Sequence, residues 1–161
     1  MKVVLSGFGG RHKCGFSLIE LVVVILIVAI ITASASPRLF DFAGQSRESA
    51  TARTVDTIRA AIDLYVADHS AYPETIDPAW FASQKLTNPF DPNHANPIFV
   101  ASHPAHAFPR FKTLVSGSAF WYNKDNGAFS ARVPAQDSDA ETINLFNRVN
   151  DSDITTLDQR R

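Results

Sequence analysis

The sequence lacks the features with which many small secreted domains and enzymes build a site. Cys14 is the only cysteine, so no disulfide can form within the chain and no site can contain several cysteine ligands. Neither sign of charge dominates, since 15 Lys and Arg stand against 16 Asp and Glu. A nucleic-acid-binding surface would require a basic stripe, and none is present. Only 7 glycines occur, and none forms a phosphate-binding loop.

Residues that could form a catalytic centre or a metal site are present, but their spacing does not favour either. Ser118 or Ser130 could be combined with His106 and an aspartate, yet no nucleophile-elbow sequence surrounds either serine. His94, His103 and His106 could be drawn as a metal cluster. The prolines between them and the lack of helical spacing favour an exposed loop instead. We therefore predict no enzyme, no metal site and no cofactor.

The most informative pattern is an apolar run from Leu21 to Ile31 that directly follows one acid, Glu20. A carboxylate at the edge of a hydrocarbon-compatible segment is costly, so it normally marks a function and a partner. At about 1.5 Å per residue, a helix over residues 16–36 is about 31 Å long. This length is enough to cross the hydrocarbon core of a bilayer, and we predict a transmembrane helix here.

The hexad Gly15-Phe16-Ser17-Leu18-Ile19-Glu20 resembles the processing site of type IV prepilins and type II secretion pseudopilins. The resemblance implies that a prepilin peptidase cuts between Gly15 and Phe16, removes residues 1–15 as a leader and methylates the new N-terminal Phe16. It also implies that Glu20 is kept for filament assembly. The Phe16 amine of one subunit would pair with the Glu20 carboxylate of another. Such a pair is strong only when both charges leave water together, so it would fix the register between subunits.

The same resemblance implies a function, partners and a location. The chain would be a structural subunit of a type II secretion pseudopilus, placed first in the inner membrane with its N-terminus cytoplasmic and its head periplasmic. The basic residues before the apolar run agree with that orientation: Lys2, Arg11 and Lys13. Its partners would be copies of itself or related pilins, prepilin peptidase, the inner-membrane assembly platform and membrane lipid. No nucleic-acid partner is expected.

Two alternatives stay open at the level of sequence. One is a type IV pilin used in adhesion, motility or DNA uptake. The pseudopilin is favoured over it because the cysteine pair of many pilins is missing and because of a Tyr-Pro and Asp-Pro pattern at Tyr72-Pro73, Asp91-Pro92 and Asn96-Pro97. The other alternative is a secreted soluble protein, released by signal peptidase after Ala33-Ser34-Ala35, which is a small-x-small cleavage site.

A long helix from about Phe16 to His69 is predicted, with a change of character at Pro37. A proline inside a helix removes one hydrogen bond and kinks the helix, although a simple helix end at the membrane surface is the alternative. Residues 37–69 form the predicted amphipathic stalk. Their apolar stripe recurs every three to four residues: Val55, Ile58, Ile62, Tyr65 and Val66. The opposite, solvated face contains Asp56, Arg59 and Asp63.

Residues 70–161 are predicted to form a small head, which gives a pilin-like α+β fold with a long helix packed on a small antiparallel sheet. Possible strands cover 98–101 and 111–115, and a short helix covers 78–85 with Trp80 and Phe81 as core contacts. The clearest element is a hairpin that joins 119–122 to 129–133 through Lys124-Asp125-Asn126-Gly127. A capping box at Ser138 and Glu141 predicts a C-terminal helix. The tail beyond Asn150 would add an edge strand or fray.

Two functional readings of the hairpin are weaker than the structural one. Major pseudopilins carry a calcium-binding loop with a Gly-x-Asp-Gly signature, and the nearest match here, residues 124–127, departs from it. Calcium is therefore possible but unsupported. Phe120-Trp121-Tyr122 could form a stacking platform for a ligand, but a strand in the core is the favoured interpretation.

Overall fold

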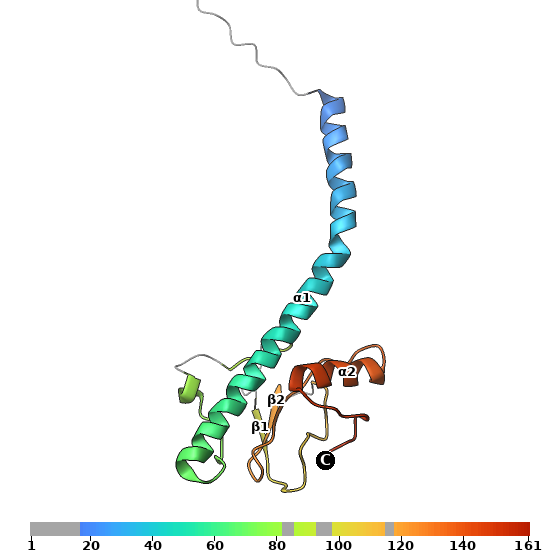
Figure 1. Ribbon diagram of the computed structural model, residues 1–161. Coiled ribbons are helices and arrows are strands. Elements are labelled where there is room, and N and C mark those ends of the chain that lie inside the picture. The colour runs from blue at the N-terminus through green and yellow to red at the C-terminus, as the bar shows by residue number, and fades with distance from the viewer. Residues whose placement is uncertain (1–16, 82–85, 93–97, 115–117) are drawn as a thin grey trace, which may run out of the picture. The chain divides into compact units, whose positions relative to one another are not determined.

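The computed structural model describes residues 17–81, 86–92, 98–114 and 118–161. Its elements, in chain order, are α1 (Leu18–His69), the 3-10 helix η1 (Pro78–Phe81), β1 (Ile98–Ala101), β2 (Phe120–Asn123), β3 (Phe129–Ala131) and α2 (Asp139–Asn150) (Figure 1). The chain divides into two compact units, Met1–Asp41 and Phe42–Arg161, and α1 contributes residues to both. The predicted α+β class, with a long N-terminal helix, is confirmed.

The core of the second unit forms where α1 packs against the sheet and α2. The predicted apolar stripe is confirmed, because Val55, Ile58 and Ile62 are all buried, and Val66 packs at the edge of the same cluster. Burying each such side chain stabilises the fold by about 1.5–3 kcal/mol relative to leaving it in water. This packing fixes the face that α1 turns toward the rest of the head.

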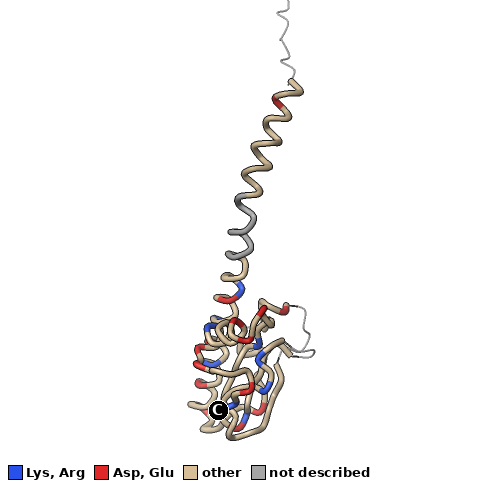
Figure 2. Tube along the Cα trace, turned by 90° about the vertical axis from the view of Figure 1, so that its right-hand side faces the viewer, with Lys and Arg blue, Asp and Glu red and all other residues tan. Residues whose placement is uncertain are grey.

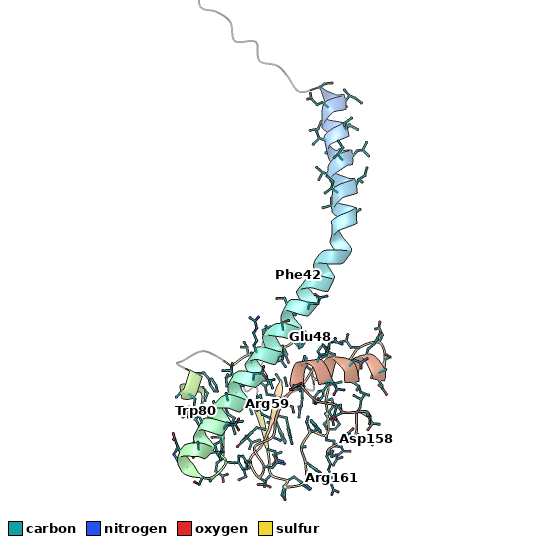
Figure 3. All side chains as sticks on the ribbon, viewed as in Figure 1. Phe42, Glu48, Arg59, Trp80, Asp158 and Arg161 are labelled. Carbon is teal, nitrogen blue, oxygen red and sulfur yellow. The ribbon has the colours of Figure 1, made fainter. Side chains whose placement is uncertain are left out.

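The prediction that Arg59 lies on the solvated face of α1 is wrong. Asp56 and Asp63 are exposed, but Arg59 is half-buried and reaches the hairpin. Its Nε and Nη2 atoms donate to the Phe129 carbonyl at 3.2 and 3.0 Å. Figure 3 labels Arg59 on α1. The long arginine stem lets the guanidinium leave its own face of the helix and satisfy a carbonyl of β3. Burial lowers the pKa of Arg59, partly offset by Asp56 and Asp151.

The sheet has three strands in the order β1-β2-β3, and it is mixed rather than wholly antiparallel as predicted. β2 and β3 are antiparallel, with Tyr122 opposite Phe129, whereas β1 runs parallel to β2, with Ile98 opposite Phe120. A parallel pair requires a long crossover, and the chain between residues 102 and 119 supplies it. Every residue of β2 and β3 is buried, so these strands are covered on both faces.

The hairpin forms as predicted, and its glycine has the conformation that the turn needs. Asn123 N donates to Ala128 O, and Gly127 N donates to Asn123 O, both at 2.8 Å. Gly127 has a φ of 74°, in the left-handed region that residues with a Cβ rarely adopt. The turn therefore joins β2 to β3 through a positive φ that glycine adopts without strain.

Two predicted elements are shorter than expected. No strand covers residues 111–114, where only an isolated bridge joins Thr113 to Val133, and Val115 lies outside the described residues. The helix at Pro78 is a single 3-10 turn that ends at Phe81, and residues 82–85 also lie outside them. Trp80 and Phe81 pack against the core, as predicted.

The C-terminal helix begins at the predicted cap. The Ser138 side chain accepts from the Glu141 N–H at 3.3 Å, and α2 ends at Asn150, followed by the C-cap residue Asp151, which has a φ of 48°. Beyond it the tail neither frays nor forms a strand. Ile154 is buried, and the Arg160 carbonyl accepts from the N–H groups of Ala107 and Phe108 at 2.7 and 3.2 Å. The tail is therefore hydrogen-bonded to the loop that precedes residue 110.

Candidate functional site

The first part of α1 exposes an unbroken apolar surface. Between Leu18 and Ile31, eleven large apolar side chains are exposed, with fractions from 46% to 80%: Leu18, Ile19, Leu21, Val23, Val24, Ile25, Leu26, Ile27, Val28, Ile30 and Ile31. They lie on all sides of the helix, as Figure 3 shows. A helix that is apolar all round is normally surrounded by lipid or by other chains.

Glu20 is the only charged residue between Leu18 and Ala33, and it lies in the first turn of α1 (Figure 2). A carboxylate in the first turn is favourably placed with respect to the helix dipole. The predicted cleavage site, Gly15 and Phe16, lies outside the described residues. The pairing of Glu20 with a Phe16 amine therefore stays a prediction.

The next predicted features are the helix kink at Pro37 and the transmembrane helix before it. Pro37 lies inside α1, so the alternative in which the helix ends there is not observed. The kink at Pro37 stays a prediction. Within the part of the chain that the structure describes, no helix combines the length and the apolarity needed to cross a membrane.

His103 and His106, two of the three histidines considered for a metal site, lie on a loop. His94 is outside the described residues, whereas the rings of His103 and His106 stack with centroids 3.6 Å apart. Desolvation, His103 and the two C-terminal arginines lower the pKa of His106. Among the described residues, no three His, Cys, Asp or Glu side chains are grouped to hold a metal ion.

The serines considered for catalysis have structural partners. Ser118 Oγ accepts from Arg132 Nη1, and Ser130 is buried in β3. Neither hydroxyl is hydrogen-bonded to His106 within the described part of the chain. Phe120 and Tyr122 are wholly buried, which confirms the core strand for these two side chains. The Trp121 side chain is 4% exposed and lines a pocket.

The loop compared with a calcium site uses its polar atoms to hold the hairpin turn. Asp125 accepts from Ser102 Oγ at 3.0 Å through each carboxylate oxygen. Lys124 forms an ion pair with Glu74, and Asn126 Oδ1 accepts from Ala128 N at 3.0 Å. These contacts connect the turn to the loop after β1 and to the segment that follows α1.

The Tyr72-Pro73 pair, one of the motifs noted in the sequence, lies against the hairpin. Tyr122 Oη donates to the Pro73 carbonyl at 2.8 Å. Burial raises the pKa of Tyr122, and Tyr72 and Glu74 raise it further. This hydrogen bond anchors the chain just after α1 to the central strand. Asp91, from the second motif, donates its N–H to Asn88 O at 2.7 Å, whereas Asn96 and Pro97 lie outside the described residues.

Buried amides that the sequence analysis did not identify hold the same region together. Asn88 Nδ2 donates to the carbonyls of Ala119 and Arg132 at 3.0 and 2.8 Å. Asn150 Oδ1 accepts from Ala131 N at 2.7 Å, while its Nδ2 donates to Ala131 O at 3.0 Å. Periodicity did not indicate them, because a buried asparagine and an exposed one look alike in sequence. The Asn-Pro pair at residues 88–89 was the only local signal.

The N-terminal part of the chain is similar to known protein sequences. Residues 10–36 match the family described as the prokaryotic N-terminal methylation motif. Three proteins described as type II secretion system core protein G are similar over longer stretches. That of Pseudomonas aeruginosa is 35% identical over 65 residues, covering 40% of this chain and 46% of the relative.

The other two relatives share less identity over more residues. The Vibrio cholerae protein is 27% identical over 94 residues, covering 58% of this chain and 64% of the relative. The Dickeya chrysanthemi protein is 26% identical over 84 residues, covering 52% and 55%. The chain thus spans between about half and two thirds of the length of these curated relatives. No solved structure matches it.

Proposed function

We propose that the chain is a structural subunit of a type II secretion pseudopilus, because residues 10–36 match the prokaryotic N-terminal methylation motif and the chain is similar to three core G proteins of that system. Prepilin peptidase would cut after Gly15, and the inner membrane would hold the subunit until the assembly platform extracts it. Filament growth would then add copies of this chain or related pseudopilins. The role is structural, and no step of it requires a bond to be made or broken by the head.

The observation that carries this proposal is the composition of the first part of α1. Its side chains are apolar and exposed, and Glu20 is their single charged neighbour. An acid within such a surface is stabilised when a cation reaches it inside the same apolar medium. The amine of a neighbouring Phe16 would be that cation. Each added subunit would then bury the apolar side chains of the previous one and satisfy its acid.

Mass spectrometry of the native N-terminus tests the proposal most directly. A mature chain that begins with N-methylated Phe16 supports it. A chain that begins at Ser36 would instead identify a secreted soluble protein cut by signal peptidase, and would contradict it.

A deletion strain separates the pseudopilus from the type IV pilus. We expect loss of secretion of type II substrates on deletion of the gene and recovery on complementation. Intact secretion combined with loss of adhesion, motility or DNA uptake would assign the chain to a type IV pilus instead.

A further inference from the structure

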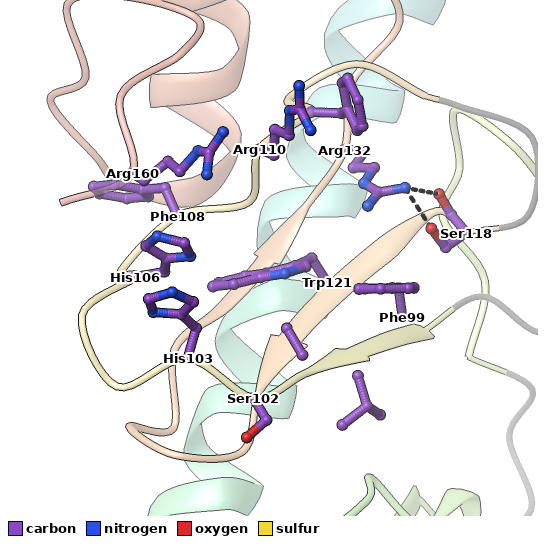
Figure 4. A pocket seen from close by; sticks show the side chains of 13 residues that line it. Phe99, Ser102, His103, His106, Phe108, Arg110, Ser118, Trp121, Arg132 and Arg160 are labelled. Carbon is purple, nitrogen blue, oxygen red and sulfur yellow. Dashed lines mark hydrogen bonds between the residues drawn. The ribbon is translucent and has the colours of Figure 1, made fainter.

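The head contains an open pocket of about 630 Å³, a volume within the range of about 300–1,000 Å³ typical of small-molecule sites (Figure 4). It lies beside β1 and β2. Its walls combine aromatic rings with cationic groups, chiefly Phe99, Phe111, Trp121, Arg110, Arg132 and Arg160. No Asp or Glu belongs to its described lining. The pocket is therefore both apolar and positively charged.

Arg132 is the unusual member of this set. Its side chain is only 5% exposed, and its Nη1 donates to the backbone and side-chain oxygens of Ser118. Its Nε is buried and has no acceptor among the described residues. The guanidinium lies 5.9 Å from the centroid of the Phe99 ring, and no carboxylate of the described chain neutralises it by an ion pair. Burial lowers the pKa of Arg132, as expected for a charge taken out of water without a counter-ion.

Two further guanidinium groups, those of Arg110 and Arg160, line the same pocket. Figure 4 shows Arg110, Arg132 and Arg160 on one side of the Trp121 ring. Arg110 is exposed, with its Cζ atom 5.3 Å from the Phe111 ring centroid. Neither Arg110 nor Arg160 forms an ion pair within the described residues. Asp158 interacts electrostatically with Lys112 and Arg160, but it does not line the pocket.

Guanidinium groups bind carboxylates by charge-assisted hydrogen bonds, which are stronger where water is partly excluded. The ring of Phe99, a residue that is 53% exposed, offers apolar surface beside those groups, and the small exposed edge of Trp121 forms part of the same wall. We propose that this pocket binds an organic carboxylate whose apolar part lies on Phe99, against the exposed edge of Trp121, and whose carboxylate is held by Arg110 and Arg160. The buried Arg132 guanidinium, which has no ion-pair partner in the described chain, adds positive charge to the wall of the pocket. This ligand site is separate from assembly through α1 and does not rest on the pseudopilus proposal.

The test uses the full-length chain in detergent, with 3-phenylpropionate as the probe and 3-phenylpropanamide as its neutral counterpart. The chain has 2 tryptophans, so NMR spectra contain two indole N–H signals to follow. Trp80 serves as an internal reference, because it does not line the pocket. Its ring stacks on that of Tyr65, with the ring centroids 5.3 Å apart. We expect a saturable shift of the Trp121 signal alone, with the amide at least about tenfold weaker, or about 1.4 kcal/mol.

The variants isolate the contribution of charge within the pocket. The double substitution Arg110→Gln and Arg160→Gln should weaken binding of 3-phenylpropionate by at least about tenfold. Arg53→Gln is the matched control, since Arg53 is an exposed arginine of α1 outside the pocket, and it should leave the affinity unchanged. Arg132 is left intact because it also holds Ser118. Equal affinity for the acid and the amide, equal shifts at both tryptophans or an unaffected double variant would overturn the proposal.

A pair of short peptides ending in phenylalanine distinguishes the source of the carboxylate. Binding of the free-acid peptide but not of its amidated form assigns the site to a polypeptide terminus. If 3-phenylpropionate binds and neither peptide does, the site takes a small free acid.

Discussion

The ring of Tyr72 covers Gly127 so closely that a Cβ placed on this glycine would lie 2.3 Å from Tyr72 Cε1. The contact joins the segment just after α1 to the turn of the hairpin. Tyr72 is 43% exposed, so its ring has room to move outward. Moving a neighbouring side chain cannot relax the φ of 74° at Gly127, because this angle belongs to the backbone of the turn. The backbone conformation thus requires a glycine at this position, and the contact with Tyr72 adds a smaller penalty for any larger residue.

Gly127→Ala is expected to destabilise the head by about 1–3 kcal/mol, because the alanine must adopt a strained φ. Denaturation of the full-length chain in detergent measures this change. Adding Tyr72→Ala should recover only the part that comes from the clash. Gly44→Ala is the matched control, since nothing lies within 4 Å of a Cβ there and alanine favours a helix. If Gly127→Ala were as stable as Gly44→Ala, the strain argument would fail.

Glu20→Ala should leave cleavage and methylation at Phe16 intact but reduce filament yield by more than about tenfold, or about 1.4 kcal/mol. The reason is that the incoming Phe16 amine would then have no carboxylate to pair with inside an apolar medium. Mass spectrometry and electron microscopy of overproducing cells measure the two outcomes. Asp68→Ala, an exposed acid near the other end of α1, should assemble normally. Normal filaments from Glu20→Ala would refute the pairing.

Lys112 should make the stability of the head depend on pH. Its side chain is 2% exposed and donates to the Pro109 carbonyl at 2.7 Å and to the Gln159 carbonyl. Burial, and to a smaller extent Arg160, lower the pKa of Lys112 from 10.5 to about 8. Between these two values the unfolded chain binds a proton that the folded chain does not, so raising the pH favours folding. Below pH 8 both states carry the proton, and the contribution is constant.

The measurement compares the wild type with Lys112→Met across this range. The free energy of unfolding of the wild type, minus that of the variant, should rise between about pH 8 and pH 10 by up to about 1.4 kcal/mol per unit. For Lys124→Met the difference should stay flat over this range and fall only above pH 10.5, because the hydrogen bond to Glu74 raises the pKa of Lys124 from 10.5. A difference for Lys112→Met that stays flat with pH would show that its amine titrates normally.

Asn150→Ala should cost about 2–4 kcal/mol, because it leaves both backbone groups of Ala131 in β3 without their partner inside the core. Chemical denaturation measures the loss. Asn144→Ala is the control on the same helix, since Asn144 is exposed, and it should change stability by less than about 0.5 kcal/mol. Equal stabilities of the two variants would mean that Asn150 does not support the strand edge.

The sequence predicted those parts of the fold that arise from local patterns. The stripe at Val55, Ile58 and Ile62, the cap at Ser138 and the turn at Gly127 each depend on residues close together in the chain. The parallel pairing of β1 with β2 was not predicted, because the direction of a strand is decided by a distant partner.

The candidate sites show the same difference between features set by neighbouring residues and features set by distant ones. The N-terminal segment was found because an acid before an apolar run is visible within a few residues. The pocket was missed because Arg110, Arg132 and Arg160 are brought together only by the crossover between β1 and β2 and by the tail. Arg59 was misplaced for a related reason, since its acceptor, Phe129 O, is contributed by the distant hairpin.

The position of Gln159 has a consequence for the order in which the head is completed. A ribosome makes the chain from its N-terminus, so Gln159 and Arg160 emerge long after Lys112. Until then the Lys112 amine lacks its acceptor at Gln159, and Ala107 and Phe108 lack theirs at Arg160. The head can therefore finish folding only after Gln159 and Arg160 have left the ribosome. A chain interrupted before these two residues would present an incomplete head to the cell's proteases.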